Sequence, residues 1–208
     1  MQKDAGFWDT IAEKYSKQPI ADEAAYQKKL KITQELFSSD MEVLEIGCGT
    51  GSTAIIHAPF VKHIRATDVS LKMIEIAQSK AAKDGIENIT FEVAPCDEIN
   101  VPDQSLDIVL GMSILHLLEN RDEIIAKVYR MLKPGGAFVS STVCLTGIMK
   151  LLKPVIPVGA FFGKMPQCVK FFSRRELEQA LIDAGFVIEY QWQPDKNKAL
   201  FIVAKKPG

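Results

Sequence analysis

Short apolar runs alternate along this chain with longer stretches in which apolar residues recur at helical spacing. Such runs are typical of strands buried in a sheet, and their alternation with helices predicts a parallel sheet covered on both faces. Helices are expected over residues 22–37, 51–58, 70–83, 121–132 and 173–184. Strands are expected over residues 41–46, 63–67, 89–93, 106–110, 137–142, 187–191 and 199–204. The pattern therefore predicts the α/β fold class.

Turn-forming residues mark the ends of several expected elements. Gly85 closes one helix, and the run Pro134-Gly135-Gly136 separates another helix from the strand that follows it. The last two strands are split by the polar residues 194–197, so we expect them to form a hairpin.

Glycine occupies every second position of the turn after the first expected strand, at Gly47, Gly49 and Gly51. Glycines let a ligand approach the backbone, and a helix that starts near Gly51 points its free N–H groups at that ligand. Nicotinamide- and flavin-binding folds usually have the spacing Gly-x-Gly-x-x-Gly, and here the third glycine comes one residue early. The turn favours a nucleoside cofactor.

An acidic residue ends the second expected strand. Asp68 follows residues 63–67 at the carboxyl end of that strand, where a carboxylate can accept hydrogen bonds from both hydroxyls of a ribose. The alternative is that Asp68 is an acid at a helix N-terminus, which is favourable in itself. Ser70 is available as the N-cap, which makes that alternative less attractive.

Four segments together resemble the class I S-adenosylmethionine-dependent methyltransferases, small-molecule type. They are Glu45-x-Gly47-x-Gly49-x-Gly51, Asp68-Val69-Ser70-x-x-Met73, the fourth strand Leu106-Asp107-Ile108-Val109-Leu110, and Met131-Leu132-Lys133-Pro134-Gly135-Gly136. Their order and spacing also fit. The resemblance is strong over about residues 40–145 and weak at both ends.

The resemblance implies a Rossmann-like three-layer sandwich with a seven-stranded, mostly parallel sheet whose last strand is antiparallel. It implies one methyltransferase domain over residues 1–208, with N-terminal lid helices over about 1–38 and a cap insertion over about 143–172. The implied cofactor is S-adenosylmethionine, with S-adenosylhomocysteine as the product.

The resemblance also implies which residues bind the methyl donor. Amides of the glycine turn would meet the donor carboxylate, Asp68 would hold the ribose, and Val69 and Met73 would sandwich the adenine. Glu45 would orient the turn or meet the ammonium. Val69 and Met73 could instead be plain core residues. The expected donor site is Glu45, Gly47, Cys48, Gly49, Gly51, Asp68, Val69, Met73, Cys96, Asp97, Gly111 and Met112.

The loop after the third strand departs from the family pattern. Pro95 stands where the family usually has the acid that reads the adenine amino group, and a proline offers no side-chain acceptor. Either Asp97 takes this role from a shifted loop or the Cys96 amide reads the ring alone. The plainer alternative is that Asp97 is a solvated loop acid.

Two residues are candidates for catalysis. His116 follows the fourth strand at the edge where ligands of open α/β sheets bind, so it could act as a general base. The alternative is a histidine that packs on the next helix, and direct displacement does not require a base. Tyr15, in the apolar segment 7–15, is expected as a lid residue or as an anchor for the terminus. Tyr26 and Lys29 are weaker candidates for lining the acceptor side.

Composition restricts the classes of function that remain open. The 208 residues have a net charge of −1 and are 47% hydrophobic, so the chain can bury a core and carries no nucleic-acid footprint. No stretch is long and apolar enough to span a bilayer, and the first residues do not read as a signal peptide. The four cysteines and three histidines are too scattered for a metal site. We expect a cytoplasmic protein with reduced thiols and no metal.

The segment 143–172 is strongly apolar and basic. No Asp or Glu occurs between Glu123 and Glu176, whereas this interval contains several lysines and arginines. As a cap over the acceptor pocket, it points to a small acceptor that is apolar or weakly anionic. The alternatives are transient contact with an anionic membrane surface, and a helical cap whose lysines reach outward to solvent.

The sequence thus predicts methyl transfer from S-adenosylmethionine to an O, N or C atom of a small molecule. One alternative is a catalytically silent donor-binding or interaction module, which Pro95 favours. A nicotinamide-dependent oxidoreductase is disfavoured by the glycine spacing. The oligomeric state stays open.

Overall fold

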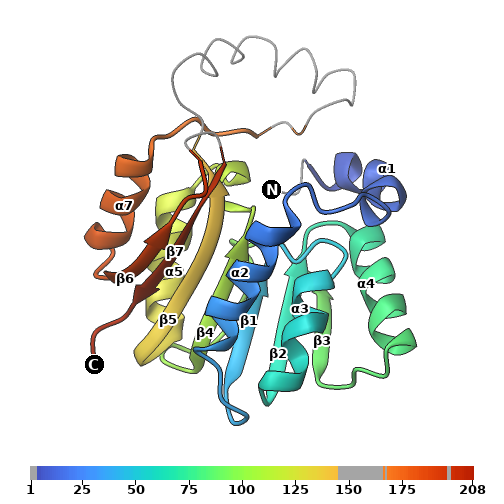
Figure 1. Ribbon diagram of the computed structural model, residues 1–208, viewed down its shortest axis with the longest axis horizontal. Helices are drawn as coiled ribbons and strands as arrows, with labels where there is room; N and C mark the ends of the chain where they lie inside the picture. Colours follow the sequence, from blue (N-terminus) through green and yellow to red (C-terminus); the bar gives the residue numbers. More distant parts are fainter. Residues whose placement is uncertain (1–3, 145–165, 167, 196–197) are drawn as a thin grey trace.

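Seven strands form one sheet in the computed structural model, which describes residues 4–144, 166, 168–195 and 198–208. The order across the sheet is β3-β2-β1-β4-β5-β7-β6 (Figure 1). The strands are β1 Glu42–Ile46, β2 His63–Asp68, β3 Ile89–Val93, β4 Leu106–Met112, β5 Leu132–Val143, β6 Val187–Trp192 and β7 Ala199–Lys205.

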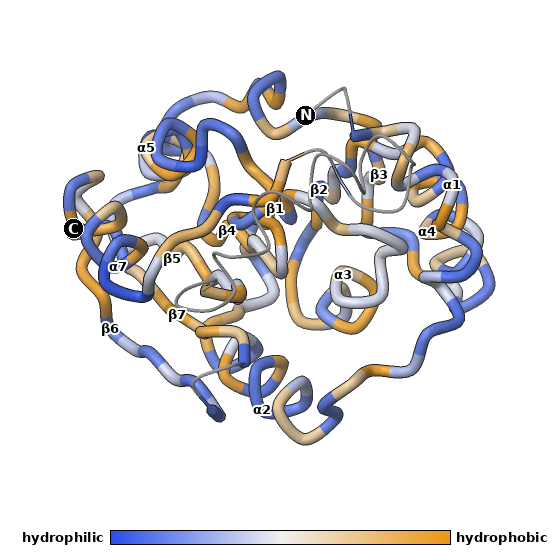
Figure 2. Tube along the Cα trace, turned by 90° about the horizontal axis from the view of Figure 1, so that it is seen from above, coloured by the Kyte–Doolittle hydropathy of each residue, from blue (hydrophilic) through white to orange (hydrophobic). Residues whose placement is uncertain are grey.

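Helices cover both faces of this sheet. They are α1 Ala5–Ser16, α2 Glu23–Gln34, α3 Ser52–His57, α4 Leu71–Lys83, α5 Arg121–Met131 and α7 Arg174–Asp183, with short 3-10 turns at Ala58–Phe60 and Leu115–Leu117. From above, the sheet runs between α2, α3 and α4 on one side and α5 and α7 on the other (Figure 2). Each face buries its own apolar cluster, so the central strands are apolar on both sides. The expected three-layer arrangement is confirmed.

Strand directions match the expected sheet. β1 pairs in parallel with β2 and β4, and the pairs β2–β3 and β4–β5 are also parallel. β7 is antiparallel to β5 and to β6, which makes it the antiparallel last strand, inserted between the two. β6 and β7 form the expected hairpin.

One predicted boundary is wrong. We expected Pro134-Gly135-Gly136 to separate helix from strand, but β5 begins at Leu132 and includes them. The register passes from Leu106 opposite Leu132 to Ile108 opposite Ala137, so the chain bulges between these pairs. The bulge stays in the sheet because the Gly135 N–H donates to the carbonyl of Lys206 at 2.9 Å, and the Lys206 N–H donates to Gly136 at 2.9 Å.

The parallel strands β1, β2 and β4 end at the edge of the sheet near α1 (Figure 1). Asp68 ends β2 and Met112 ends β4, and both line one cavity with residues of α1. Most of the expected cap, residues 145–165 and 167, lies outside the described residues. Beyond it the chain returns beside the 3-10 turn that follows β4, because the Lys170 N–H donates to the carbonyl of His116 at 2.7 Å. In the part of the chain that the structure describes, no helix is long and apolar enough to cross a membrane.

Candidate functional site

The glycine turn after β1 needs its glycines for two reasons. Gly47, Gly49 and Gly51 have φ of +67°, +54° and +74°, in the left-handed region where other residues are strained. A Cβ at Gly47 would lie 2.7 Å from the Ile114 side chain, and one at Gly51 would lie 2.7 Å from Ala77. A Cβ at Gly49 would meet only an aromatic ring of α1, at 3.7 Å. The turn is therefore packed tightly at both ends and open in the middle.

Asp68 connects the glycine turn to the turn between β2 and α4. Its Oδ2 accepts from the Gly49 N–H at 2.9 Å, and its Oδ1 accepts from the Ser70 N–H at 2.9 Å. Ser70 is the N-cap of α4, as expected, and its Oγ accepts from the Met73 N–H at 3.1 Å. Burial raises the pKa of Asp68, and the backbone hydrogen bonds oppose that shift. Because a carboxylate has about four acceptor sites, Asp68 keeps capacity for a ligand.

Glu45 is a buried carboxyl beside the glycine turn. It is 1% exposed, and its Oε2 has no hydrogen-bond partner among the residues that the structure describes. Burial, with a smaller contribution from the negative charge of Asp68, raises the pKa of Glu45 to about 8. An unpaired buried carboxyl is costly unless it stays protonated or receives a cation. The site thus contains an acceptor that suits a ligand ammonium.

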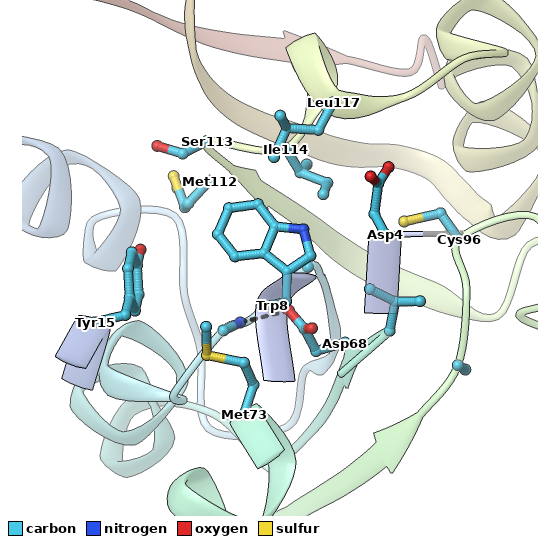
Figure 3. Close-up of a pocket in the computed structure, with 14 residues that line it drawn as sticks. Asp4, Trp8, Tyr15, Asp68, Met73, Cys96, Met112, Ser113, Ile114 and Leu117 are labelled. Atoms are coloured by element: carbon cyan, nitrogen blue, oxygen red, sulfur yellow. Dashed lines mark hydrogen bonds between the residues drawn. The ribbon is translucent and has the colours of Figure 1, made fainter. Parts of the chain in front are cut away.

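A first cavity lies beside Asp68 and has a volume of about 70 Å³. Figure 3 shows the Trp8 indole within it, between Asp68 and the end of β4. The lining comes from α1 and the residue before it, the glycine turn, the end of β2, α4, the loop after β3, and the end of β4 with the segment that follows: Asp4, Trp8, Tyr15, Gly47, Gly49, Asp68, Val69, Met73, Ala94, Cys96, Met112, Ser113, Ile114 and Leu117.

Helix α1 is fixed over this cavity. Asp9 Oδ1 accepts from Ser70 Oγ at 2.6 Å and from the Lys72 N–H at 3.0 Å, which ties α1 to the start of α4. Trp8 packs edge-on against Tyr15, with ring centroids 6.4 Å apart. The resemblance led us to expect a lid from this segment, with Tyr15 as its candidate, but the sequence did not single out Trp8 or Asp9.

A second cavity of about 480 Å³ lies on the other side of the glycine turn, under α2 and α3. Its wall carries polar groups from Tyr26, Lys29, Glu45, His57 and Ser141. His57 is fully buried, and in the described part of the chain neither ring nitrogen has a hydrogen-bond partner; burial lowers its pKa to about 4. The two cavities meet at shared lining residues: Tyr15, Gly47, Gly49, Met112 and Ser113.

The loop after β3 contains the two residues expected to recognise adenine, and it places them in different surroundings. Cys96 is buried and lines the first cavity. Asp97 is exposed and lines a separate shallow pocket, while its carbonyl accepts from Lys127 Nζ at 2.7 Å. The geometry thus brings Cys96 to the first cavity and leaves the Asp97 carboxylate outside it.

His116 lies near the site without lining either cavity. Its Nδ1 is 3.0 Å from Thr142 Oγ1, and burial lowers its pKa. A neutral, half-buried imidazole bonded to a β5 hydroxyl suits packing. Its role as a general base stays a prediction.

Among the other predicted residues, Val69, Met73 and Met112 line the first cavity and Cys48 lines the second. Gly51 and Gly111 line neither; a Cβ at Gly111 would lie 3.1 Å from the Phe138 ring. All four cysteines are free thiols. Within the described residues, no three His, Cys, Asp or Glu side chains gather into a metal-binding group.

Residues 43–136 match the family model described as methyltransferase domain. The uncharacterized methyltransferase YcgJ of Bacillus subtilis is 32% identical over 101 residues, which are 49% of this chain and 40% of that protein. The matched part thus spans less than half the length of this curated relative.

Solved structures share the fold over a larger part of the chain. The crystal structure of YcgJ superposes with a TM-score of 0.73 at 19% identity, covering 88% of this chain and 99% of that chain. An S-adenosylmethionine-dependent methyltransferase from Mesorhizobium loti gives 0.72 at 21% identity, covering 89% and 99%.

The family match covers the strands that carry the glycine turn, Asp68 and Met112. The structural superposition on YcgJ covers a larger part of the chain. Residues 43–136 match the methyltransferase domain family, and the chain shares the fold of solved S-adenosylmethionine-dependent methyltransferases.

Proposed function

We propose that the protein transfers the methyl group of S-adenosylmethionine to a small-molecule acceptor. The observation that carries this proposal is the placement of Asp68. Its carboxylate is held by the Gly49 and Ser70 amides at the wall of the first cavity, at the carboxyl edge where α/β sheets bind ligands.

The chain's polar groups suit the chemistry of this donor. Asp68 has acceptor capacity left for the ribose hydroxyls, and the unpaired Glu45 Oε2 suits the donor ammonium. The open middle of the glycine turn lets the donor approach the backbone at Gly49, whose N–H already donates to Asp68. The apolar side chains of Val69 and Met73 line the first cavity where the adenine would lie.

The junction of the two cavities is where we place methyl transfer. S-adenosylmethionine supplies an electrophilic methyl group on a sulfonium. The residues shared by both cavities, Gly47, Gly49, Met112, Ser113 and Tyr15, would orient the acceptor toward it. Proximity and alignment account for a large share of the rate of such displacements.

Donor binding requires Trp8 to move. The first cavity holds about 70 Å³ beside the indole, whereas small-molecule sites usually measure about 300–1,000 Å³. We therefore expect α1 to shift, or the Trp8 side chain to turn, and the indole then to cover the bound adenosine.

Calorimetry with S-adenosylhomocysteine, S-adenosylmethionine and NAD tests the proposal. We expect binding of the first two and none of NAD. NAD binding without donor binding would overturn it. Donor binding without labelled product across a broad panel of small acceptors would favour a catalytically silent module.

A further inference from the structure

Lys29 places a positive charge in the wall of the second cavity. It lies on α2, is half-buried, and donates from Nζ to Ser141 Oγ at 2.9 Å. Burial lowers its pKa. Among the residues that the structure describes, no carboxylate forms an ion pair with Lys29. A partly desolvated ammonium with one neutral partner can bind an anion strongly.

Asp22 is the acidic group that acts on Lys29, and it is already engaged. It opposes the pKa shift of Lys29 from a distance. Its own carboxylate accepts from the Ala25 N–H at 3.1 Å as the N-cap of α2, and lies 3.5 Å from Lys198 Nζ. Glu45 lines the same cavity, but among the described residues it forms no ion pair with Lys29, so the charge of Lys29 remains available to a ligand there.

The order of the strands places Lys29 away from the ribose site. Asp68 ends β2, the glycine turn follows β1, Met112 ends β4, and Ser141 lies on β5 opposite Met112. Strands are about 4.8 Å apart, so Ser141 lies three strands, or roughly 14 Å, from Asp68. Lys29 thus lies beyond the residues that the two cavities share, on the side of the site where the acceptor is expected.

We propose that Lys29 binds an anionic group of the methyl acceptor, so that the site selects small molecules with a carboxylate or another small oxyanion. This inference rests on the proposed methyltransferase function. Ser141 would hold the ammonium in place, and Tyr26 contributes a hydroxyl to the same wall. Pro19 and Leu30 add apolar surface, which fits an acceptor with an apolar body and a charged end.

Paired probes that differ in charge test this. The full chain, saturated with S-adenosylhomocysteine, is titrated with 4-hydroxybenzoate and with 4-hydroxybenzamide, and dissociation constants are measured by ligand-observed NMR. We expect the carboxylate to bind at least about tenfold more tightly, the effect of one charge-assisted hydrogen bond. The preference should disappear in Lys29→Met and Lys29→Gln and persist in Lys29→Arg. The exposed Lys31 on the same helix provides the control, Lys31→Met, which should behave as the unmodified protein.

Each result decides the inference. Equal binding of the two probes, absence of binding by both, or a preference that survives in Lys29→Gln would overturn it. A tenfold loss of S-adenosylhomocysteine affinity in Lys29→Gln would also overturn it, because Lys29 would then hold the donor carboxylate. If the unmodified protein binds no S-adenosylhomocysteine, the proposed function itself fails.

Discussion

The cavity beside Asp68 and the cavity beside Lys29 meet at the glycine turn, but the chain builds them in different ways. In the first, the polar groups come from two short segments on neighbouring strands, and hydrogen bonds of 2.9 Å from Gly49 and Ser70 fix the carboxylate. In the second, Lys29 meets Ser141 across 112 positions of sequence. The first site is therefore determined locally, and the second depends on how α2 packs on the sheet.

The two cavities also differ in electrostatics. Asp68 lines the first cavity, whereas Glu45 lies beside the glycine turn in the wall of the second, and burial raises the pKa of both carboxyls. Lys29, on α2, adds a positive charge to the second cavity. A donor that carries an ammonium and an acceptor that carries an anion would thus each face a complementary group.

The largest expected effect concerns the rigidity of the glycine turn. Gly51→Ala should lower the free energy of unfolding by about 2–4 kcal/mol, from left-handed backbone strain and from a Cβ placed 2.7 Å from Ala77 and 2.9 Å from Phe91. Gly85 has a similar φ of +67° with no atom within 4 Å, so Gly85→Ala should lose only about 1–2 kcal/mol. Urea unfolding measures both, and equal losses would show that packing around the turn is unimportant.

Asp68→Ala should weaken S-adenosylhomocysteine binding by about 1.5–3 kcal/mol, because it removes charge-assisted hydrogen bonds. Asp97→Ala is the matched control, since the Asp97 carboxylate lies outside the cavity. This variant should bind S-adenosylhomocysteine with an affinity within about twofold of the unmodified protein. Calorimetry distinguishes them. A loss at Asp97 with none at Asp68 would reverse the assignment of the donor side.

Glu45 should make the ligand-free protein less stable as the pH rises. Its pKa is about 8 in the folded protein against 4.5 for an unperturbed glutamate side chain. Between these values the folded state holds a proton that the unfolded chain has lost, so increasing pH favours unfolding by up to about 1.4 kcal/mol per pH unit. Between pH 6.5 and 8, Glu45→Gln should show a flatter profile in urea unfolding. Parallel profiles would mean that Glu45 is ionised.

The smallest effect is optical. If the Trp8 indole leaves the cavity when the donor site fills, S-adenosylhomocysteine should change tryptophan fluorescence. The chain has two tryptophans, and the other, Trp192, ends β6 at the far edge of the sheet. The change should vanish in Trp8→Phe and persist in Trp192→Phe. The reverse pattern would place the rearrangement elsewhere.

The same contrast explains what could be predicted from the sequence. The strands and the turn at Gly47 to Gly51 follow from local apolar runs and backbone requirements, and the observed sheet confirms them. The boundary at Pro134 was wrong because Leu132 already pairs with Leu106 of β4, and Gly135 and Gly136 exchange backbone hydrogen bonds with Lys206, just after β7. The local sequence pattern does not show which distant segments pair in the folded protein.

Side chains brought in by long-range packing were harder to predict. The position of Trp8 depends on hydrogen bonds from Asp9 to the start of α4, more than 60 residues away. Lys29 could be named as a weak acceptor-side candidate, but its lack of a carboxylate partner emerges only in the folded arrangement. His116 follows the expected strand, yet the 3-10 turn at Leu115–Leu117 places it beside Thr142 rather than in a cavity wall.

A crystal structure of the complex with S-adenosylhomocysteine tests the central claim most directly. We predict both ribose hydroxyls within hydrogen-bond distance of Asp68, the amino group at Glu45, the sulfur at the junction near Met112, and no contact between the ligand and Lys29. Ribose hydroxyls remote from Asp68, or a ligand carboxylate bonded to Lys29, would contradict the division of the site into a donor side and an acceptor side.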